Sequence, residues 1–312
     1  MLPLQQAFLC GSSLNKFWES FMDNLLHWIW LSTSVRAGGE SFRKLYDKFG
    51  SADAIYYADE NEIAAVIGTR SSDYTALSDK SLETAQKILE FCRTKSVGIL
   101  VYSDDKYPEN LRKISNPPVL LYYRGSLPDF NSAMCISVVG TRSVSDYGCR
   151  NAFYVSRDLA KSGATIVSGM AIGIDGVALA GALSEGKATV AVIGSGIDVC
   201  YPMQHKRLAR EIVKRGCVMT EYAPGTRPSG SNFPVRNRII SGLSEATLVI
   251  EGHEKSGAVI TARRAFAQGR VVYALPGNVG NRNSEATNLL IKNGAKAFSS
   301  ADDIVRDLKK LI

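Results

Sequence analysis

The residues best suited to chemistry in this sequence are arginines that stand beside small residues and an aromatic ring. Arg142 follows Gly140 and Thr141 directly after an apolar run. A second stretch, residues 227–238, mixes basic, amide and aromatic side chains, and its candidate site residues are Arg227, Asn232, Phe233, Arg236, Asn237 and Arg238. Guanidinium groups bind phosphate through paired hydrogen bonds, and an aromatic ring stacks on an unpaired base. These residues together predict contacts to a single nucleic-acid strand.

Three more segments are rich in small residues that suit phosphate binding. The candidates are Ser168, Gly169 and Gly173, then Gly194, Ser195 and Gly196, and finally Ser256 with Gly257. Small residues let backbone N–H groups approach an anion, and the N-terminus of a helix favours negative charge. Neither G-x-G-x-x-G nor G-x-x-x-x-G-K-[ST] occurs, so the standard dinucleotide and nucleoside-triphosphate sites are not indicated.

Structural roles for the same residues stay open at this point. A glycine turn after a strand is often only a tight connection, and Phe233 is apolar enough to belong to the core. The competing ion pairs are Arg142 with Asp175 or Asp198, and an arginine of residues 227–238 with Glu221 or Glu251.

Hydrophobic periodicity predicts the elements that must position these residues. Short apolar runs are expected to form strands at residues 135–139, 165–168, 189–193, 217–221, 247–251 and 271–275. Amphipathic helices are expected near residues 147–162, 175–184, 203–215, 236–241, 257–268 and 283–293. This alternation predicts an extended Rossmann-like, doubly wound and mostly parallel sheet. Ligands of such sheets bind outside the carboxyl ends of the strands, where the small-residue loops would gather.

The front part of the chain has a different pattern. Apolar residues recur at helical spacing between about residues 25 and 92, and Ser51 and Asp59 resemble helix N-caps. Two short β-branched or aromatic runs follow, at residues 97–102 and 119–123. We expect an N-terminal extension over residues 1–24, a small helical domain over 25–95 and the Rossmann-like domain over 96–312.

The charge of the 312-residue chain is concentrated in its second part. Residues 1–130 carry 14 Lys and Arg against 16 Asp and Glu, a net charge of −2, whereas the remaining 23 and 14 give +9. A local basic excess is typical of proteins that bind nucleic acid, although a solvated basic surface has the same composition.

The composition also limits the location and the cofactors of the protein. The six cysteines form no C-x-x-C pair, and there are only three histidines, so neither a metal site nor a resident cofactor is indicated. No apolar run approaches the length of a membrane helix, and the first ten residues lack the basic start of a signal peptide. We expect a cytoplasmic protein with reduced thiols and no membrane partner.

An ordered set of motifs resembles the DprA/Smf family of DNA-processing proteins. The similar segments are Val139–Arg142, Val167–Asp175, Ala191–Asp198, Glu221–Tyr222, Asn232–Ile240, Ser256–Ala262, Pro276–Gly277 and Asn288–Ala295. The resemblance covers about residues 97–300. The set in this order is far more specific than any one of its members.

The resemblance implies a protein that binds single-stranded DNA in a basic pocket and has no catalytic residues. It implies a homodimer formed through the Rossmann-like domain, transfer of the strand to the RecA recombinase in natural transformation or homologous recombination, and a front domain similar to the sterile alpha motif. By the family pattern, Arg142 is the main phosphate contact. Phe233, Arg236 and Arg238 would flank the strand.

Two other functions compete with this reading. Glu251 at a strand end, with Arg142 holding a phosphate, is similar to the arrangement in LOG-type nucleotide hydrolases, yet their P-G-G-x-G-T-x-x-E element does not occur. A nucleotide-binding or scaffolding role is the other alternative. An open basic groove would favour a nucleic-acid strand, and a closed pocket would favour a small nucleotide.

Overall fold

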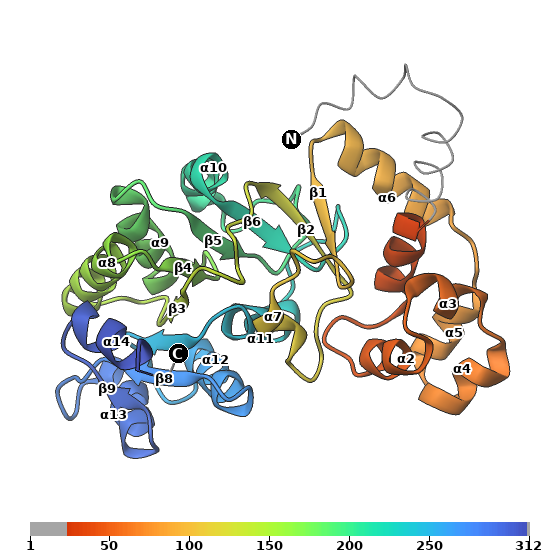
Figure 1. Ribbon diagram of the computed structural model, residues 1–312. Helices are drawn as coiled ribbons and strands as arrows, with labels where there is room; N and C mark the ends of the chain where they lie inside the picture. The colour runs from red at the N-terminus through yellow and green to blue at the C-terminus, as the bar shows by residue number, and fades with distance from the viewer. Residues whose placement is uncertain (1–23, 311–312) are drawn as a thin grey trace.

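The computed structural model describes residues 24–310 and is built on one nine-stranded sheet (Figure 1). The strand order is β1-β2-β6-β5-β4-β3-β7-β8-β9. The strands are β1 Gly98–Val101, β2 Leu120–Gly125, β3 Cys135–Val139, β4 Thr165–Ser168, β5 Thr189–Val192, β6 Cys217–Thr220, β7 Ala246–Val249, β8 Val271–Ala274 and β9 Lys296–Ala297. Strands β3 to β9 pair in parallel, and β2 is antiparallel to both β1 and β6. The predicted doubly wound, mostly parallel sheet is confirmed.

Helices connect the parallel strands and form the front of the chain. After a helix at residues 24–34, the front helices are α2 Ser41–Phe49, α3 Ala52–Tyr57, α4 Glu60–Ile67, α5 Ser72–Ser78 and α6 Glu83–Thr94. The later ones are α7 Glu109–Arg112, α8 Asp146–Lys161, α9 Ile174–Ser184, α10 Lys206–Arg215, α11 Asn232–Gly242, α12 Gly257–Ala267, α13 Glu285–Lys292 and α14 Ala301–Leu308. The 3-10 helices Met203–His205 and Arg282–Ser284 precede α10 and α13.

Strand β3 shows how the sheet is buried on both faces. Ile136 and Val138 point into a core shared with α8, α9 and α14. On the other face, the Ser137 hydroxyl donates a hydrogen bond to the carbonyl of Ile240 in α11, at 2.8 Å. Both faces of the strand are covered, so the one hydroxyl in its sequence is hydrogen-bonded inside the protein.

The front helices pack on the edge of the sheet that β1 and β2 form (Figure 1). Trp28 and Leu45 belong to the same apolar core as Leu100 of β1 and Tyr122 of β2. The predicted N-caps are confirmed: the Ser51 hydroxyl accepts from the amide of Ala54, and Asp59 forms a capping box. The expected extension over residues 1–24 lies outside the described residues except for its last one.

The order in which the chain adds strands to the sheet reverses between β3 and β7. From β3 the chain winds outward through β4, β5 and β6, and it then returns to add β7 and β8 on the other side. The crevice at such a switch point is where open α/β sheets bind ligands. The start of one predicted helix differs, because α11 begins at Asn232 and not near residue 236, and the short helix α7, strand β9 and helix α14 were not predicted.

Candidate nucleic-acid interface

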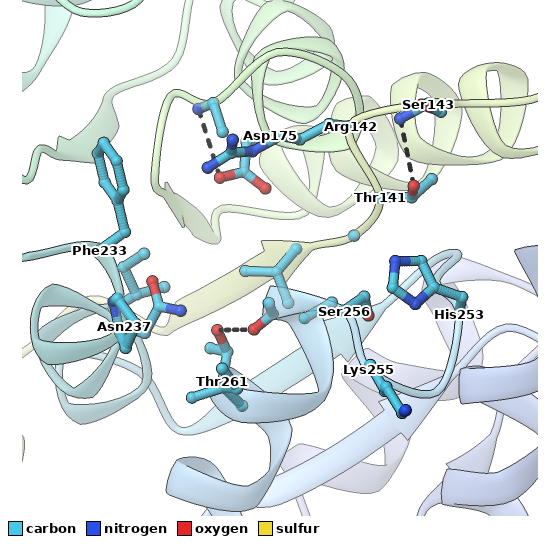
Figure 2. Close-up of a pocket in the computed structure, with 18 of the residues that line it drawn as sticks. Thr141, Arg142, Ser143, Asp175, Phe233, Asn237, His253, Lys255, Ser256 and Thr261 are labelled. Carbon is cyan, nitrogen blue, oxygen red and sulfur yellow. Dashed lines mark hydrogen bonds between the residues drawn. The ribbon is translucent and has the colours of Figure 1, made fainter. Parts of the chain in front are cut away.

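A pocket of about 600 Å³ opens at the switch point, between the ends of β3 and β7 (Figure 2). The β3–α8 loop supplies Gly140, Thr141 and Arg142. Helix α11 supplies Phe233, Arg236 and Asn237, and the start of α12 supplies Ser256 and Gly257. The structure therefore brings together predicted residues that lie up to 117 positions apart in the sequence.

Arg142 lies exposed at the rim of this pocket on a loop whose backbone is fixed. The amide of Thr141 donates to the carbonyl of Glu251 at 2.8 Å, and the amide of Ser143 donates to the Thr141 hydroxyl at 3.2 Å. Among residues 24–310, the Arg142 guanidinium has no carboxylate partner within ion-pair distance. It lies 5.6 Å from the centre of the Phe233 ring. The ion pairs with Asp175 and Asp198 are thus not formed.

Phe233 is half-buried and stacks on a second aromatic ring. Its ring centre lies 5.6 Å from that of Tyr201, and the two planes are inclined by 24°. Gly194 makes room for this ring, because a Cβ atom there would lie 2.9 Å from Cδ1 of Phe233. The ring also contributes to a small cleft on the Tyr201 side of the pocket, so it is not a core residue.

Arg236 is a buried cation that lines both the pocket and this small cleft. Its Nη1 donates to the carbonyl of Gly169 at 2.7 Å and also to the carbonyl of Val192. Burial lowers the pKa of the Arg236 guanidinium to about 10, so the group stays charged at neutral pH. Burial also raises the pKa of Asp175, which is the one acidic residue lining the pocket in the described chain.

Two exposed cations complete the positive lining. Lys255 precedes α12, and Arg282 lies in the segment after β8. Figure 2 shows Lys255 and His253 on the loop that faces Phe233 across the pocket. Gly257, the first residue of α12, has no atom within 4 Å of the position that a Cβ would take. A ligand can therefore approach the backbone at this helix N-terminus, where the helix dipole favours an anion.

Arg238 does not reach the pocket, which corrects the expectation that it flanks a bound strand. Its guanidinium, 2% exposed, pairs with the Glu221 carboxylate, 5% exposed, at 2.5 Å. The ion pair with Glu221, which the sequence left open, is the one that forms. Helical geometry is the cause. An α-helix turns by about 100° per residue, so Arg238 points to nearly the opposite side from Arg236, which lines the pocket.

Other predicted residues support the site without lining the pocket. The Ser168 hydroxyl is buried and donates to Val138, and Asn232 donates to the carbonyl of Gly194 at 3.1 Å. Gly169, Gly194 and Ser195 line the small cleft. Gly173 and Gly196 pack against protein backbone, and exposed Arg227 lines neither hollow.

Lys255 and Arg282 of the pocket and Tyr201 of the small cleft are among the lining residues that were not predicted from the sequence. Lys255 lies directly before Ser256 and Gly257. A lysine that precedes small residues at the start of a helix is the pattern by which it could have been predicted. Arg282 begins the 3-10 helix before α13, in a segment without a motif, and the contact of Tyr201 with Phe233 joins segments 32 residues apart. No local sequence pattern predicts the position of Arg282 or the contact between Tyr201 and Phe233.

Glu251 has a structural role instead of facing the pocket. The carboxylate, 2% exposed, accepts hydrogen bonds from both the amide and the hydroxyl of Ser145, the N-cap of α8. The acid that a LOG-type hydrolysis requires is therefore engaged at a helix start. Within residues 24–310, no three metal-ligating side chains converge, and no helix combines the length and apolar character that crossing a bilayer requires.

Comparison with known sequences identifies one family. Residues 98–309 match the family model of DNA recombination-mediator protein A. The chain is 37% identical over 222 residues to DNA processing protein DprA of Bacillus subtilis, an alignment that covers 71% of this chain and 75% of that protein. It is 38% identical over 248 residues to DNA processing protein DprA of Streptococcus pneumoniae, covering 80% and 86%.

Two solved structures share the fold. The X-ray structure of DNA processing protein A from Streptococcus pneumoniae matches with a TM-score of 0.76 and 34% identity, over 89% of this chain and 95% of that one. A structure of DNA processing protein A from Helicobacter pylori, described as showing its single-stranded DNA binding mode, matches with a TM-score of 0.62 and 27% identity, over 69% and 96%.

Proposed function

We propose that this chain, which belongs to the DNA recombination-mediator protein A family, binds single-stranded DNA in the pocket between β3 and β7. One observation carries the proposal: the exposed guanidinium of Arg142 and the half-buried ring of Phe233 lie together in a pocket lined by further cations. A phosphate on the guanidinium would place a neighbouring base close to the ring. Base stacking of this kind requires an unpaired strand.

The likeness to the Helicobacter pylori protein, whose structure is described as showing its single-stranded DNA binding mode, supports the same assignment. The role of a recombination mediator further supports transfer of the strand to the RecA recombinase, in natural transformation or homologous recombination. A homodimer that works in the cytoplasm is the form we propose for this activity. Five cysteines of the described chain are free, which fits a reducing compartment.

The test is a titration of a labelled oligonucleotide, as single strand and as duplex, at two salt concentrations. We expect preferential binding of the single strand, with an affinity that falls as salt rises. Arg142→Ala should weaken this binding and reduce the slope of log K against log salt by about 0.7, the value for one phosphate contact on a single strand. Equal affinity for duplex, or a wild-type slope in the variant, would contradict the proposal.

Transfer to RecA and dimer formation need separate measurements. RecA filament growth on single strands coated with single-strand-binding protein should speed up when this protein is added. Arg142→Ala should remove that gain. Sedimentation of the free protein decides the oligomeric state independently of DNA.

A further inference from the structure

A second hollow lies between α10, the loop that follows β5, and strands β2 and β6. We call it the α10 groove. It encloses about 730 Å³. Its apolar wall is formed by the partly exposed Val199, Ala209 and Val213, which lie over the buried Met170 and Ile193. A wall of this kind can receive the faces of unstacked bases, because every base has an apolar face.

Positive charge surrounds this apolar wall. Lys206, Arg207 and Arg210 line the groove from α10, and all three are exposed. None of them has a carboxylate partner within ion-pair distance among residues 24–310. Arg124 of β2 also lines the groove, and its buried Nε has no hydrogen-bond partner in the described chain. The two acids of the lining are already engaged: Asp198 accepts from the amide of Gly225, and Glu211 pairs with Lys214.

The groove borders the small cleft beside the DNA pocket along three loops. Met170, Ile193 and Cys200 line the groove, and the residues next to them in sequence, Gly169, Gly194 and Tyr201, line the small cleft. The cleft in turn shares Arg142, Phe233 and Arg236 with the DNA pocket. The Tyr201 ring, 42% exposed, stacks on Phe233 at the border between the two hollows.

We propose that the α10 groove is a second subsite for single-stranded nucleic acid, which receives the strand after it passes the Phe233–Tyr201 stack. Phosphates lie along Lys206, Arg207 and Arg210, and bases lie on the apolar wall. The inference rests on the proposed function of the first pocket. Charge complementarity and the short distance along the chain to that pocket's lining select a nucleic-acid strand over other occupants of an apolar groove.

Oligonucleotide length separates the two subsites. We would compare oligo(dT) of about 6 and about 30 nucleotides, because single-strand sites span about 4 to 16 nucleotides. The double variant Lys206→Ala/Arg210→Ala should weaken the long strand about tenfold and reduce its salt slope by about 1.4, the value for two phosphates. Binding of the short strand should stay unchanged. Arg142→Ala should weaken both lengths.

A control variant that removes the same number of positive charges shows whether a general loss of electrostatic attraction to DNA explains the effect. Lys161→Ala/Lys187→Ala removes two exposed cations that precede β4 and β5, at the opposite edge of the sheet. This control should bind both lengths like the wild type. Equal losses in the control and the α10 variant, or equal losses for short and long strands, would overturn the second subsite. If the wild type binds neither length, the function of the first pocket fails as well.

Thiol protection gives a second readout that does not depend on affinity. Cys200 lines the groove and is partly buried, and Cys149 on α8 is also partly buried but lies in neither hollow. The long strand should slow alkylation of Cys200 and leave Cys149 unchanged, and the short strand should slow neither. Protection of Cys200 without DNA that is lost on dilution would assign the groove to a second copy of the chain instead.

Discussion

The backbone of Gly173 packs directly against the backbone of Arg142. A Cβ atom on Gly173 would lie 2.8 Å from the Cα of Arg142, and the glycine has a φ of 90°. The β4–α9 loop therefore fixes the residue that we propose as the main phosphate contact. The amide of Ile174 strengthens this contact by donating to the carbonyl of Thr141 at 3.2 Å.

Gly173→Ala should weaken single-strand binding, because the new methyl group must displace the Arg142 backbone. The unfavourable φ adds a stability cost of roughly 1–3 kcal/mol. Gly163→Ala is the control, since Gly163 also has a positive φ of 97° but no atom within 4 Å of the Cβ position. The control should lose stability and keep its DNA affinity. Titration and thermal unfolding of both variants check this, and equal affinities would remove Gly173 from any positioning role.

Phe233→Ala should weaken binding of oligo(dT) by about 1–3 kcal/mol, the typical value of one stacked base. The ring is only half-buried, so the melting temperature should change little. Phe233→Tyr keeps an aromatic face and should retain most of the affinity. A large fall in melting temperature with unchanged affinity of the folded protein would show that the ring acts in packing.

Lower pH should strengthen DNA binding through Asp175. Burial raises the pKa of this carboxyl, so it takes up a proton at a higher pH than an ordinary aspartate does. Protonation removes a negative charge from the pocket, which is worth about 1 kcal/mol or roughly fivefold in Kd. Asp175→Asn should bind tightly at every pH and show no such gain, which titrations over a series of falling pH values check.

His253 also lines the pocket and serves as the control position. If Asp175 is responsible, His253→Gln should keep the gain in affinity at low pH and Asp175→Asn should lose it. A gain that persists in Asp175→Asn would contradict the role of Asp175.

Arg238→Met should destabilise the fold by about 3–5 kcal/mol, because it leaves the buried Glu221 carboxylate without its partner. The double variant Glu221→Gln/Arg238→Met should recover much of that loss. Urea unfolding measures both effects. The affinity of the folded Arg238→Met protein should stay close to that of the wild type, and a loss like that of Arg142→Ala would return Arg238 to the site.

The sheet was predictable because its strands are short, apolar on both sides and separated by amphipathic segments. Strands β3 and β4 begin and end at the predicted residues. The start of α11 was harder, since Pro234 and the glycines and serines before it resemble a loop, yet proline is tolerated in the first turn of a helix. With that start known, Phe233, Arg236 and Asn237 fall on one helix face. They line the pocket, and Arg238 faces away.

The glycine loops lie at the edge of the sheet where the sequence predicts them, and two of their glycines also make room for neighbouring residues of the protein. At Gly173 and Gly194 the missing side chain makes room for Arg142 and Phe233. Only the fold shows which neighbour occupies that space. Contacts between distant segments, such as the one between Tyr201 and Phe233, produce no periodic pattern in the sequence from which they could be predicted.

The shared core of the front helices and the edge strands decides where the chain can be divided. Leu100 and Tyr122 are buried together with Trp28 and Leu45, so a cut at the predicted boundary near residue 95 would expose apolar side chains of β1 and β2 to water. The truncated protein would tend to aggregate through that bare edge.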